Sequence, residues 1–313
     1  MNVLITSISG KVPLIQTVEK AMKKINSNSV LYGGDVDDQC IGKYFVDRFW
    51  LMPPLKDMTK ETFVSYCTSK NITIIFPTRD ADLLYFSSFL SYFTNNGLYI
   101  MVSNKKSLEI TMNKMNFFKI GVEKGFPVTM SSFEIDTLYA DTFVVKECEG
   151  SGSKNIAINV SREQAILHAK QLKGPLFQPY IKGEEFSIDV YVDKLGKSKG
   201  VIVRKRIQIK DGESQITRTI RHKELERLGA EMAEMFCLYG HVMFQVIVDL
   251  KGKPHIIECN PRFGGASTLS IAAGLDSFYW FQLEAAGEDL HNYPFHRSEK
   301  ELTLIRHAKD MIV

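Results

Sequence analysis

The stretch that decides the fold is "HVMFQVIVDLKGKPHIIECNPRF", residues 241–263. Two apolar runs flank a Lys-Gly pair, which is typical of a tight turn between antiparallel strands. Because side chains alternate along a strand, Glu258 and Asn260 share one face of the second strand and Cys259 points to the other. Gln245, on the first strand, can face the same side as Glu258. The segment therefore predicts a β-hairpin with one polar face.

This polar face carries the donor set for a divalent cation. Carboxylate and amide oxygens on adjacent strands suit Mg²⁺, whose remaining positions go to phosphate and water. Gln245, Glu258 and Asn260 are thus candidate metal ligands. Arg262, at the end of the strand, could neutralise charge on a transferring phosphoryl group. A glutamate buried without a partner would cost several kcal/mol, so a purely structural role explains Glu258 less well.

Length and composition indicate a folded protein of two or three lobes. The 313 residues are 24% charged and 44% hydrophobic, which excludes a disordered chain. A net charge of +3, with Lys and Arg dispersed, does not indicate a nucleic-acid binder. The five cysteines form no CxxC pair, so neither a disulfide frame nor a zinc site is indicated. With no leader pattern and no run of ~18 apolar residues, we expect a cytoplasmic protein that is neither secreted nor membrane-bound.

The first hundred residues alternate short apolar runs with helical patterns, as a parallel α/β sheet does. The expected strands are 2–7, 29–35, 72–78 and 98–103, and the expected helices are 13–25, about 60–70 and 81–93. This pattern predicts a Rossmann-like lobe. The loop "SISGK" after the first strand lacks GxGxxG, so a plain strand-to-helix turn is favoured there over dinucleotide binding.

Residues 142–160, "TFVVKECEGSGSKNIAINV", follow two expected helices at 105–111 and 114–124 and predict a hairpin with a Gly-Ser loop. Such a loop can lay backbone N–H groups against phosphate oxygens, because glycine allows close approach and positive φ. Lys146 on the first strand could reach the same phosphates. A flexible hairpin tip explains the loop equally well when the segment is taken alone.

Residues 176–193, "LFQPYIKGEEFSIDVYVD", follow an expected helix at 162–172 and predict a strand that turns at a Lys-Gly pair and restarts. The extended QPYI segment offers backbone groups to the edge of a flat base, and Glu185 could hold ribose hydroxyls. A solvated turn would explain one glutamate. It would not explain why the same combination follows a phosphate loop.

Residues 200–222, "GVIVRKRIQIKDGESQITRTIRH", predict two strands around an Asp-Gly turn. Alternation places Arg204 and Arg206 on one face, and Arg218 and Arg221 come from the second strand. Guanidiniums on facing strands suit a carboxylate or phosphate, which each can bind with two hydrogen bonds. An exposed charged hairpin is the alternative.

Taken in order along the chain, several of these features resemble those of the ATP-grasp fold. They are Lys114, Lys146, the GSGS loop, QPYIKGEE, Gln245, Glu258, Asn260 and Arg262. More narrowly, the chain is similar to stand-alone proteins that resemble one synthetase half of the carbamoyl phosphate synthase large subunit. The resemblance covers nearly the whole chain. It implies an α/β, Rossmann-like pre-ATP-grasp domain at 1–105 and a two-lobed α+β ATP-grasp domain at 106–313, with a small mobile lobe at about 130–182.

The resemblance also implies site residues. The phosphate-binding set would be Lys114, Lys146, Gly150, Ser151, Gly152 and Ser153. The nucleoside-binding set would be Gln178, Tyr180, Ile181 and Glu185. The set that holds one or two Mg²⁺ ions, or Mn²⁺ in their place, would be Gln245, Glu258 and Asn260. Arg262 and Arg204 would be catalytic and face an acyl phosphate. Gln178 and Gln245 are amides where the family often has carboxylates.

The activity implied by the resemblance is an ADP-forming ligase that joins a carboxylate to an amine, or to a thiol, through an acyl phosphate. Its cofactors would be ATP and Mg²⁺, and its partners a small carboxylate and an amine, with no nucleic acid and no membrane. A homodimer is compatible with the resemblance. One alternative is an ATP-binding sensor or inactive relative. Another is an NAD(P) or nucleotide-sugar oxidoreductase built on the first lobe, which the missing GxGxxG disfavours.

Overall fold

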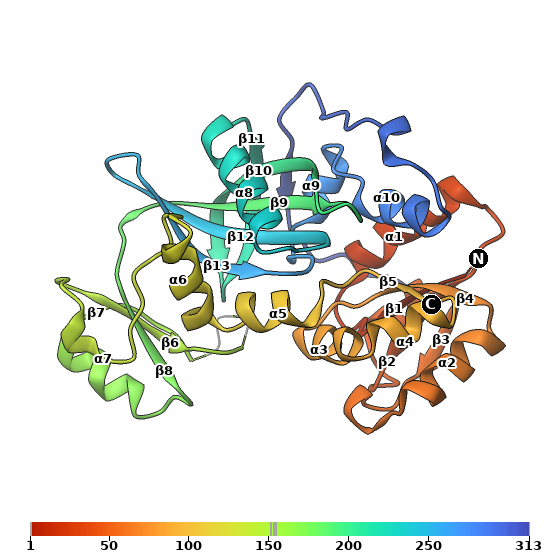
Figure 1. Cartoon of the computed structure of the whole chain (residues 1–313), viewed down its shortest axis with the longest axis horizontal. Helices are drawn as coiled ribbons and strands as arrows, with labels where there is room; N and C mark the ends of the chain where they lie inside the picture. Colours follow the sequence, from red (N-terminus) through yellow and green to blue (C-terminus); the bar gives the residue numbers. More distant parts are fainter. Residues whose placement is uncertain (1, 151, 153–154, 313) are drawn as a thin grey trace.

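The structure is a computed structural model that describes residues 2–150, 152 and 155–312. Three β-sheets follow one another along the chain (Figure 1). A five-stranded sheet near the N-terminus and a small three-stranded sheet lie at opposite ends of the molecule, and a six-stranded sheet lies between and above them. Within the described ranges, no helix has the length and hydropathy needed to cross a membrane.

The N-terminal sheet is parallel, with strand order β3-β2-β1-β4-β5. Its strands are β1 (Asn2–Thr6), β2 (Leu31–Asp35), β3 (Arg48–Leu51), β4 (Ile72–Phe76) and β5 (Tyr99–Ile100). Helix α1 (Val12–Ile25) covers one face, where Val3 and Ile5 are buried. Leu4 points to the opposite core, under the helices α2 (Lys60–Ser69), α3 (Asp80–Ser88) and α4 (Leu90–Asn95). Strand alternation therefore divides the apolar side chains between two helical layers.

The predicted elements of this lobe differ from the structure at two places. Strand β3 was not expected, because its sequence is short and lies at the exposed edge of the sheet. The expected helix at 81–93 is two helices, α3 and α4, which meet at Phe89, where φ is −125° and ψ is 19°. That backbone conformation is outside the α-helical region, so the chain bends there.

The strand order places a crevice at the carboxyl ends of β1 and β4. From β1 the chain passes to β2 and β3 on one side of the sheet, and β4 and β5 lie on the other. Open α/β sheets bind ligands where the strand order reverses in this way. The crevice lies next to the large sheet, because Asp80 at the start of α3 pairs with Arg262 just beyond the last residue of β13.

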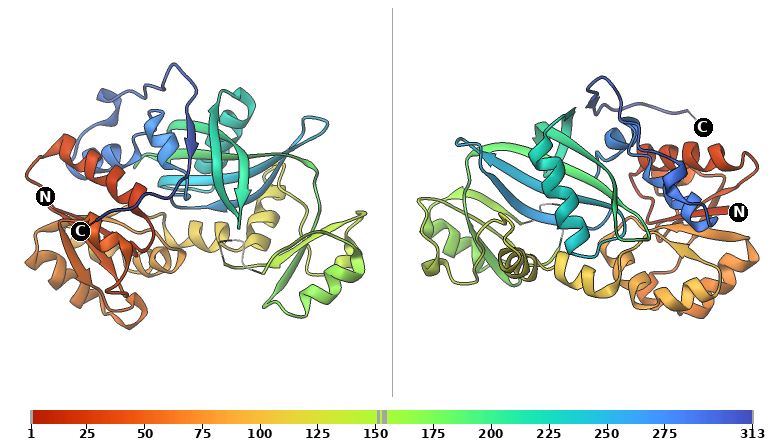
Figure 2. Two further views of the ribbon diagram at one scale, coloured as in Figure 1. Left: turned by 180° about the vertical axis from the view of Figure 1, so that it is seen from behind. Right: turned by 45° about the horizontal axis from the view of Figure 1, so that its top comes forward.

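The large sheet is antiparallel, with strand order β13-β12-β9-β10-β11-β14. Its strands are β9 (Gly183–Val192), β10 (Ser198–Lys210), β11 (Glu213–Ile220), β12 (Gly240–Asp249), β13 (Pro254–Asn260) and β14 (Thr303–Ile305). One face is apolar and lies under helix α8 (Lys223–Met235), which crosses it in Figure 2 (right). Ile188, Val190, Phe244 and the buried Cys259 belong to this core.

The other face of the large sheet changes from apolar to polar along its strands. At one end Tyr191 and Ile202 join the core formed with helix α10 (Ser277–Ala285). Further along, Glu258 lies opposite Gln245, Gln245 opposite Ser187, and Ser187 opposite Arg204. Residues directly opposed across a sheet share a face, so these four side chains form one polar row.

The small sheet is antiparallel, with strand order β7-β6-β8. It consists of β6 (Phe143–Glu147), β7 (Ala157–Val160) and β8 (Pro175–Pro179), covered by helix α7 (Arg162–Ala169). Strands β8 and β9 belong to different sheets, so the predicted turn at 182–183 is a linker between lobes and not a hairpin. The predicted mobility of this lobe stays a prediction.

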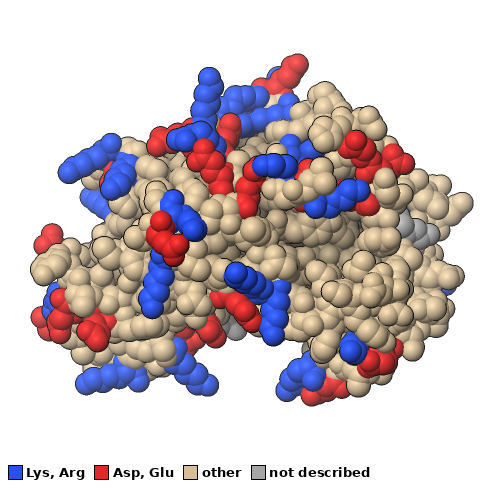
Figure 3. Space-filling model, viewed as in Figure 1, with Lys and Arg blue, Asp and Glu red and all other residues tan. Residues whose placement is uncertain are grey.

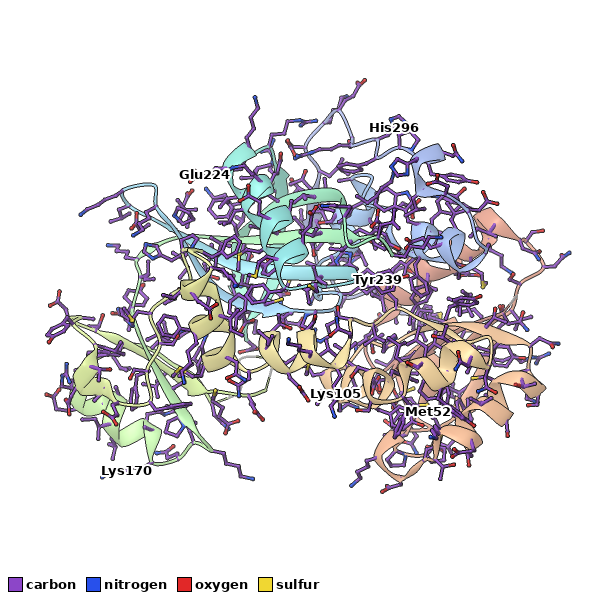
Figure 4. All side chains as sticks on the ribbon, in the orientation of Figure 1. Met52, Lys105, Lys170, Glu224, Tyr239 and His296 are labelled. Carbon is purple, nitrogen blue, oxygen red and sulfur yellow. The ribbon has the colours of Figure 1, made fainter. Side chains whose placement is uncertain are left out.

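Two short helices lead from the N-terminal lobe toward the small lobe, α5 (Lys105–Thr111) and α6 (Lys114–Glu123) (Figure 1). Figure 4 labels Lys105 and Tyr239 where α5 meets the large sheet. There the Tyr239 backbone N–H donates to Ser103 Oγ at 2.9 Å, and the Ser107 hydroxyl donates to the Cys237 carbonyl at 3.0 Å. The start of α5 is therefore tied to the large sheet.

The two chain ends lie at the same end of the molecule. After β14 the chain runs back toward the N-terminal lobe, so both termini lie beside it in the two views of Figure 2. Figure 3 shows positive and negative side chains interspersed over the face that it presents. This mixture accords with the small net charge of +3.

Candidate active site

The centre of the candidate site is Glu258, whose carboxylate accepts hydrogen bonds from two amides. Gln245 Nε2 donates to Glu258 Oε1 at 2.7 Å, and Asn260 Nδ2 donates to the same oxygen at 2.9 Å. In the described part of the chain these bonds occupy Oε1 and leave Glu258 Oε2 and Asn260 Oδ1 as acceptors. Two such oxygens fit part of the coordination shell of Mg²⁺. Glu258 and Asn260 could therefore hold a cation together.

Arg206 completes this arrangement. The sequence grouped it with Arg204 as a possible carboxylate or phosphate contact, but not with the metal or nucleotide residues. Its Nη1 donates to Gln245 Oε1 at 2.8 Å and to Glu185 Oε2 at 3.1 Å. Its Nε donates to Ser214 Oγ at 3.1 Å, and its Nη2 donates to the Gly212 carbonyl at 2.6 Å. A continuous hydrogen-bonded set thus crosses four strands. We call it the open network, and its members are Glu185, Arg206, Gln245, Glu258 and Asn260.

Two buried lysines face this network from the small-lobe side. Lys146, on β6, is 6% exposed. Burial is the main reason that the pKa of Lys146 is lowered to about 8; the Glu258 charge opposes this shift, and the Lys114 charge adds to it. Lys114 is the first residue of α6 and is also buried. The structure therefore brings two ammonium groups near the carboxylate of the candidate metal site, and the predicted phosphate-binding role of Lys114 and Lys146 stays a prediction.

The glycine-rich loop is anchored at the first turn of α6. Lys114 Nζ donates to the Gly150 carbonyl at 2.9 Å, and Asn113 Nδ2 donates to Glu149 Oε1 at 3.0 Å. Gly150 has a φ of 101°, a conformation that a residue with a Cβ rarely adopts. Gly152 is exposed, whereas the predicted Ser151 and Ser153 lie outside the described residues.

A cavity of about 450 Å³ lies between this loop, the helices α3, α5 and α6, and the end of β13. Its lining includes Asp80, Lys114, Gly150, Glu258 and Asn260. The volume is within the ~300–1,000 Å³ typical of small-molecule sites. Four of the residues predicted from the sequence thus border one space, together with the N-terminal residue of α3.

The predicted nucleoside residues lie at the junction of the small and large lobes. Gln178, on β8, is buried, and its Nε2 donates to Ser131 Oγ at 2.8 Å. Tyr180 and Ile181 are half-buried in the linker between β8 and β9, where the Tyr180 N–H donates to the Thr142 carbonyl. Glu185 is held by Arg206. The Gln178 side chain therefore forms its hydrogen bond within the small lobe, whereas the linker remains partly accessible to solvent.

Arg262 connects the large sheet to the N-terminal crevice. Its Nε donates to Asp80 Oδ1 at 2.5 Å. Lys11 lies nearby: its Nζ donates to Thr78 Oγ1 at 2.6 Å, and burial and the Arg262 charge lower its pKa to about 8. Lys11 belongs to the "SISGK" loop, whose residue types were the only sequence signal for it.

Arg204 lies in a separate, fully buried set of side chains. Its Nε donates to Asp189 Oδ2 at 2.6 Å and to Ser270 Oγ at 3.1 Å. His241 Nε2 donates to Asp189 Oδ1 at 3.1 Å, and Ser267 Oγ donates to the same oxygen at 2.6 Å. The Arg204 side chain is 1% exposed and that of Asp189 is 0% exposed. We call this set the closed network, and its members are Asp189, Arg204, His241, Ser267 and Ser270.

In the closed network, Asp189 is ionised and His241 is neutral. Burial alone would raise the pKa of Asp189, but Arg204 and His241 hold that pKa well below its ordinary value. Burial also lowers the pKa of His241, which favours the neutral imidazole. The Gly264 N–H donates to Ser267 Oγ at 2.8 Å. Through Asp189 and Ser267, Arg204 therefore helps to hold the loop that follows Arg262. Its predicted contact with an acyl phosphate stays a prediction.

The expected cluster of four guanidiniums is not present. Arg218 lies opposite Lys205, whose neighbours Arg204 and Arg206 point to the other face of the sheet, and it is exposed. Arg221 donates to Glu301 Oε1 at 2.5 Å, away from the candidate site. The sequence placed all four together because it gave no information on which face of β11 meets which face of β10.

Comparison with known proteins gives matches of two kinds. Residues 171–308 match the model of a family described as "ATP-grasp in the biosynthetic pathway with Ter operon". No curated protein matches the sequence. Many solved structures share the fold.

Three of these structures illustrate the likeness. The biotin carboxylase domain of Hydrogenobacter thermophilus 2-oxoglutarate carboxylase, in complex with MgADP, ADP and bicarbonate, superposes with a TM-score of 0.76 at 18% identity, covering 96% of this chain and 73% of that one. Campylobacter jejuni biotin carboxylase gives 0.73 at 13% identity, covering 92% and 71%. N5-carboxyaminoimidazole synthetase from Staphylococcus aureus gives 0.68 at 14% identity, covering 92% and 77%.

At these identities the superpositions establish the fold, and the finer resemblance to carbamoyl phosphate synthase stays a prediction. The superpositions extend over almost the whole chain, including the N-terminal sheet, and the family match covers most of the large sheet with its polar row. By these superpositions the chain has the ATP-grasp fold, and its residues 171–308 are similar to a family of ATP-grasp proteins.

Proposed function

We propose that the protein is an ATP-dependent ligase that joins a small carboxylate to an amine and releases ADP and phosphate. The observation that carries this proposal is the meeting of Glu258 and Asn260 with the buried lysines Lys114 and Lys146. Oxygen ligands for a cation and fixed positive charges together suit the triphosphate of ATP.

The reaction would proceed in two displacements. An oxygen of the substrate carboxylate attacks the γ-phosphorus of ATP, the bond to the bridging oxygen breaks, and ADP leaves. The amine nitrogen then attacks the acyl carbon, the carbon–oxygen bond to phosphate breaks, and the amine gives up one proton. When bound, Mg²⁺ supplies charge neutralisation at the phosphates.

In this mechanism the side chains of the protein would orient the substrates and neutralise the charge of the phosphates. Lys114 and Lys146 would hold phosphate oxygens, and the glycine-rich loop would cover them and exclude water from a labile acyl phosphate. The linker at Tyr180 and Ile181 would contact the base, and Glu185 the ribose. Arg262 would stabilise charge on the phosphoryl group being transferred.

The carboxylate and amine would enter from the crevice of the N-terminal sheet. Supporting this route, the Arg262–Asp80 pair joins the crevice to the end of β13, and Lys11 lies in the same charged group. We propose the domain division at residue 105 and closure of the lobe at about 130–182 on the same grounds, since the cavity lies between these parts.

A coupled assay of ADP release tests the proposal. Pairs of small carboxylates and amines are offered with ATP and Mg²⁺, and hydroxylamine is added in parallel to trap an acyl phosphate as a hydroxamate. Substrate-dependent ADP release with hydroxamate formation supports the ligase. ATP binding without release under any pair would favour an ATP-binding sensor instead.

A further inference from the structure

Gln245 is held between two partners of opposite charge, and this fixes the orientation of its amide. The Arg206 guanidinium can only donate hydrogen bonds, and an ionised Glu258 can only accept them. The amide oxygen must therefore face Arg206, at 2.8 Å, and the amide nitrogen must face Glu258, at 2.7 Å. The opposite orientation would lose both hydrogen bonds.

A cation bound to the Gln245 oxygen would lie beside the guanidinium. With a ligand distance of ~2.1 Å, a Mg²⁺ ion there would be within roughly 5 Å of Arg206, and like charges repel strongly in a partly buried site. Arg206 cannot relieve this by losing its proton, because arginine stays charged in proteins. Its side chain is 7% exposed and is fixed by four acceptors on four different residues.

The other candidate ligands have no such conflict. The two amide N–H groups bond Glu258 Oε1, and neither of these hydrogen bonds uses Glu258 Oε2 or Asn260 Oδ1. Among residues 2–150, 152 and 155–312, no group of three acidic, histidine or cysteine side chains could hold a metal ion. Glu258 is the one acidic residue among the three candidate ligands Gln245, Glu258 and Asn260.

We propose that the site binds one divalent cation per chain, at Glu258 and Asn260, and that the Arg206 guanidinium occupies the position of a second cation at Gln245. The inference rests on the proposed function, because it requires ATP phosphates at this site. Arg206 is then a positioning residue. It bonds Glu185 toward the nucleoside and Gln245 toward the phosphates, and so fixes the two ends of the nucleotide site relative to each other.

The experiment counts Mn²⁺ ions by electron paramagnetic resonance, with the intact protein and a non-hydrolysable ATP analogue. We expect the wild type to bind one Mn²⁺ per chain, with no spin-coupled pair. The double variant Arg206→Met/Gln245→Glu removes the guanidinium and supplies a second carboxylate. It should bind two ions that couple, because paired metals in such sites lie ~3.5–4 Å apart.

Two single variants serve as controls. Gln245→Glu alone should keep one ion, because the new carboxylate pairs with Arg206. Arg218→Met, an exposed arginine on the opposite face of the sheet, should also keep one ion.

Two coupled ions in the wild type would overturn the inference while leaving the ligase proposal intact, and this measurement requires no variant to fold. A correctly folded double variant that still binds one ion would also overturn it. If the wild type shows no nucleotide-dependent Mn²⁺ binding at all, the inference falls together with the proposed function.

Discussion

The closed and open networks lie on the same face of the same sheet, and each is centred on an arginine of β10. Arg204 pairs with Asp189 of β9, and two residues further along Arg206 pairs with Glu185 of the same strand. In the closed network the other partners of Asp189 are two buried serine hydroxyls and an imidazole. The open network ends on Glu258 and Asn260, which border the cavity.

The comparison shows that the surroundings, and not the residue type, decide which carboxylate retains acceptor capacity for a ligand. In the closed network each carboxylate oxygen of Asp189 accepts at least two hydrogen bonds within the protein, so it fixes structure and offers nothing to a ligand. In the open network Glu258 Oε2 retains acceptor capacity beside buried lysines. We therefore expect substitutions in the two networks to affect different properties.

The largest expected effect is on stability, in the closed network. Replacing Arg204 by methionine leaves Asp189 buried without its cation, which should lower the free energy of unfolding by about 3–5 kcal/mol. Urea denaturation followed by circular dichroism measures this. Arg218→Met, at an exposed position, should change stability by no more than ~0.5 kcal/mol. If Arg204→Met is as stable as the wild type, the distinction between the networks is wrong.

The next effect is on turnover, in the open network. Glu258→Gln keeps the side-chain volume but removes the charge that would hold a cation, so ADP release should fall by about 10²–10³-fold. Its urea denaturation should stay close to that of the wild type, because the residue is not fully buried. A stability loss similar to that of Arg204→Met, without loss of turnover, would move Glu258 into the structural class.

The sequence predicted the hairpin 241–263 and the facing of its side chains, because strand alternation is a local property. Glu258, Gln245 and Cys259 all lie on the expected faces. It could not separate Arg204 from Arg206. Their roles depend on which residues of β9 lie opposite, and that pairing joins segments far apart in the chain.

The same limit applies to the rest of the fold. The strands and helices of the N-terminal lobe were predicted where apolar periodicity was strong, whereas the short edge strand β3 and the break at Phe89 were missed. The linker between β8 and β9 was predicted as a turn after which the strand restarts, because the sequence does not reveal that the chain changes sheets there. The position of Lys11 depends likewise on its contact with Thr78, a residue from the next half of the lobe.

A smaller effect is expected where the two lobes meet at Arg262. In Arg262→Lys an ammonium cannot reproduce the planar, two-pronged contact that a guanidinium makes with a phosphoryl group or carboxylate. The catalytic rate should fall by about tenfold to a hundredfold, with little change in the Michaelis constant for ATP. Steady-state ADP release measures both. Arg221→Lys is the matched control, because Arg221 pairs with Glu301 away from the site. Equal rates for both variants would separate Arg262 from the chemistry.

The smallest effect is a pH dependence of ATP affinity, which we expect from Lys146 beside the open network. Arginines do not titrate in the accessible range, but the pKa of Lys146 is about 8, lowered from 10.5 chiefly by burial. Above pH 8 the unliganded protein loses the ammonium that would hold a phosphate. ATP affinity, measured by calorimetry without metal, should be constant below pH 8 and fall above it by up to about tenfold per pH unit.

The free energy of unfolding should also depend on the protonation of Lys146, but it should rise with pH where ATP affinity falls. Between pH 8 and 10.5 the unfolded chain binds more protons at this lysine than the folded chain does, so the contribution of Lys146 to the free energy of unfolding rises with pH over that window. Lys146→Met should bind ATP more weakly at pH 7, and its ATP affinity should no longer fall above pH 8. Its free energy of unfolding should rise less between pH 8 and 10.5, where Lys11, whose pKa is also about 8, still contributes. If the affinity of Lys146→Met for ATP still fell above pH 8 as in the wild type, the titrating group would be Lys11, and the phosphates would lie nearer the N-terminal crevice than the open network.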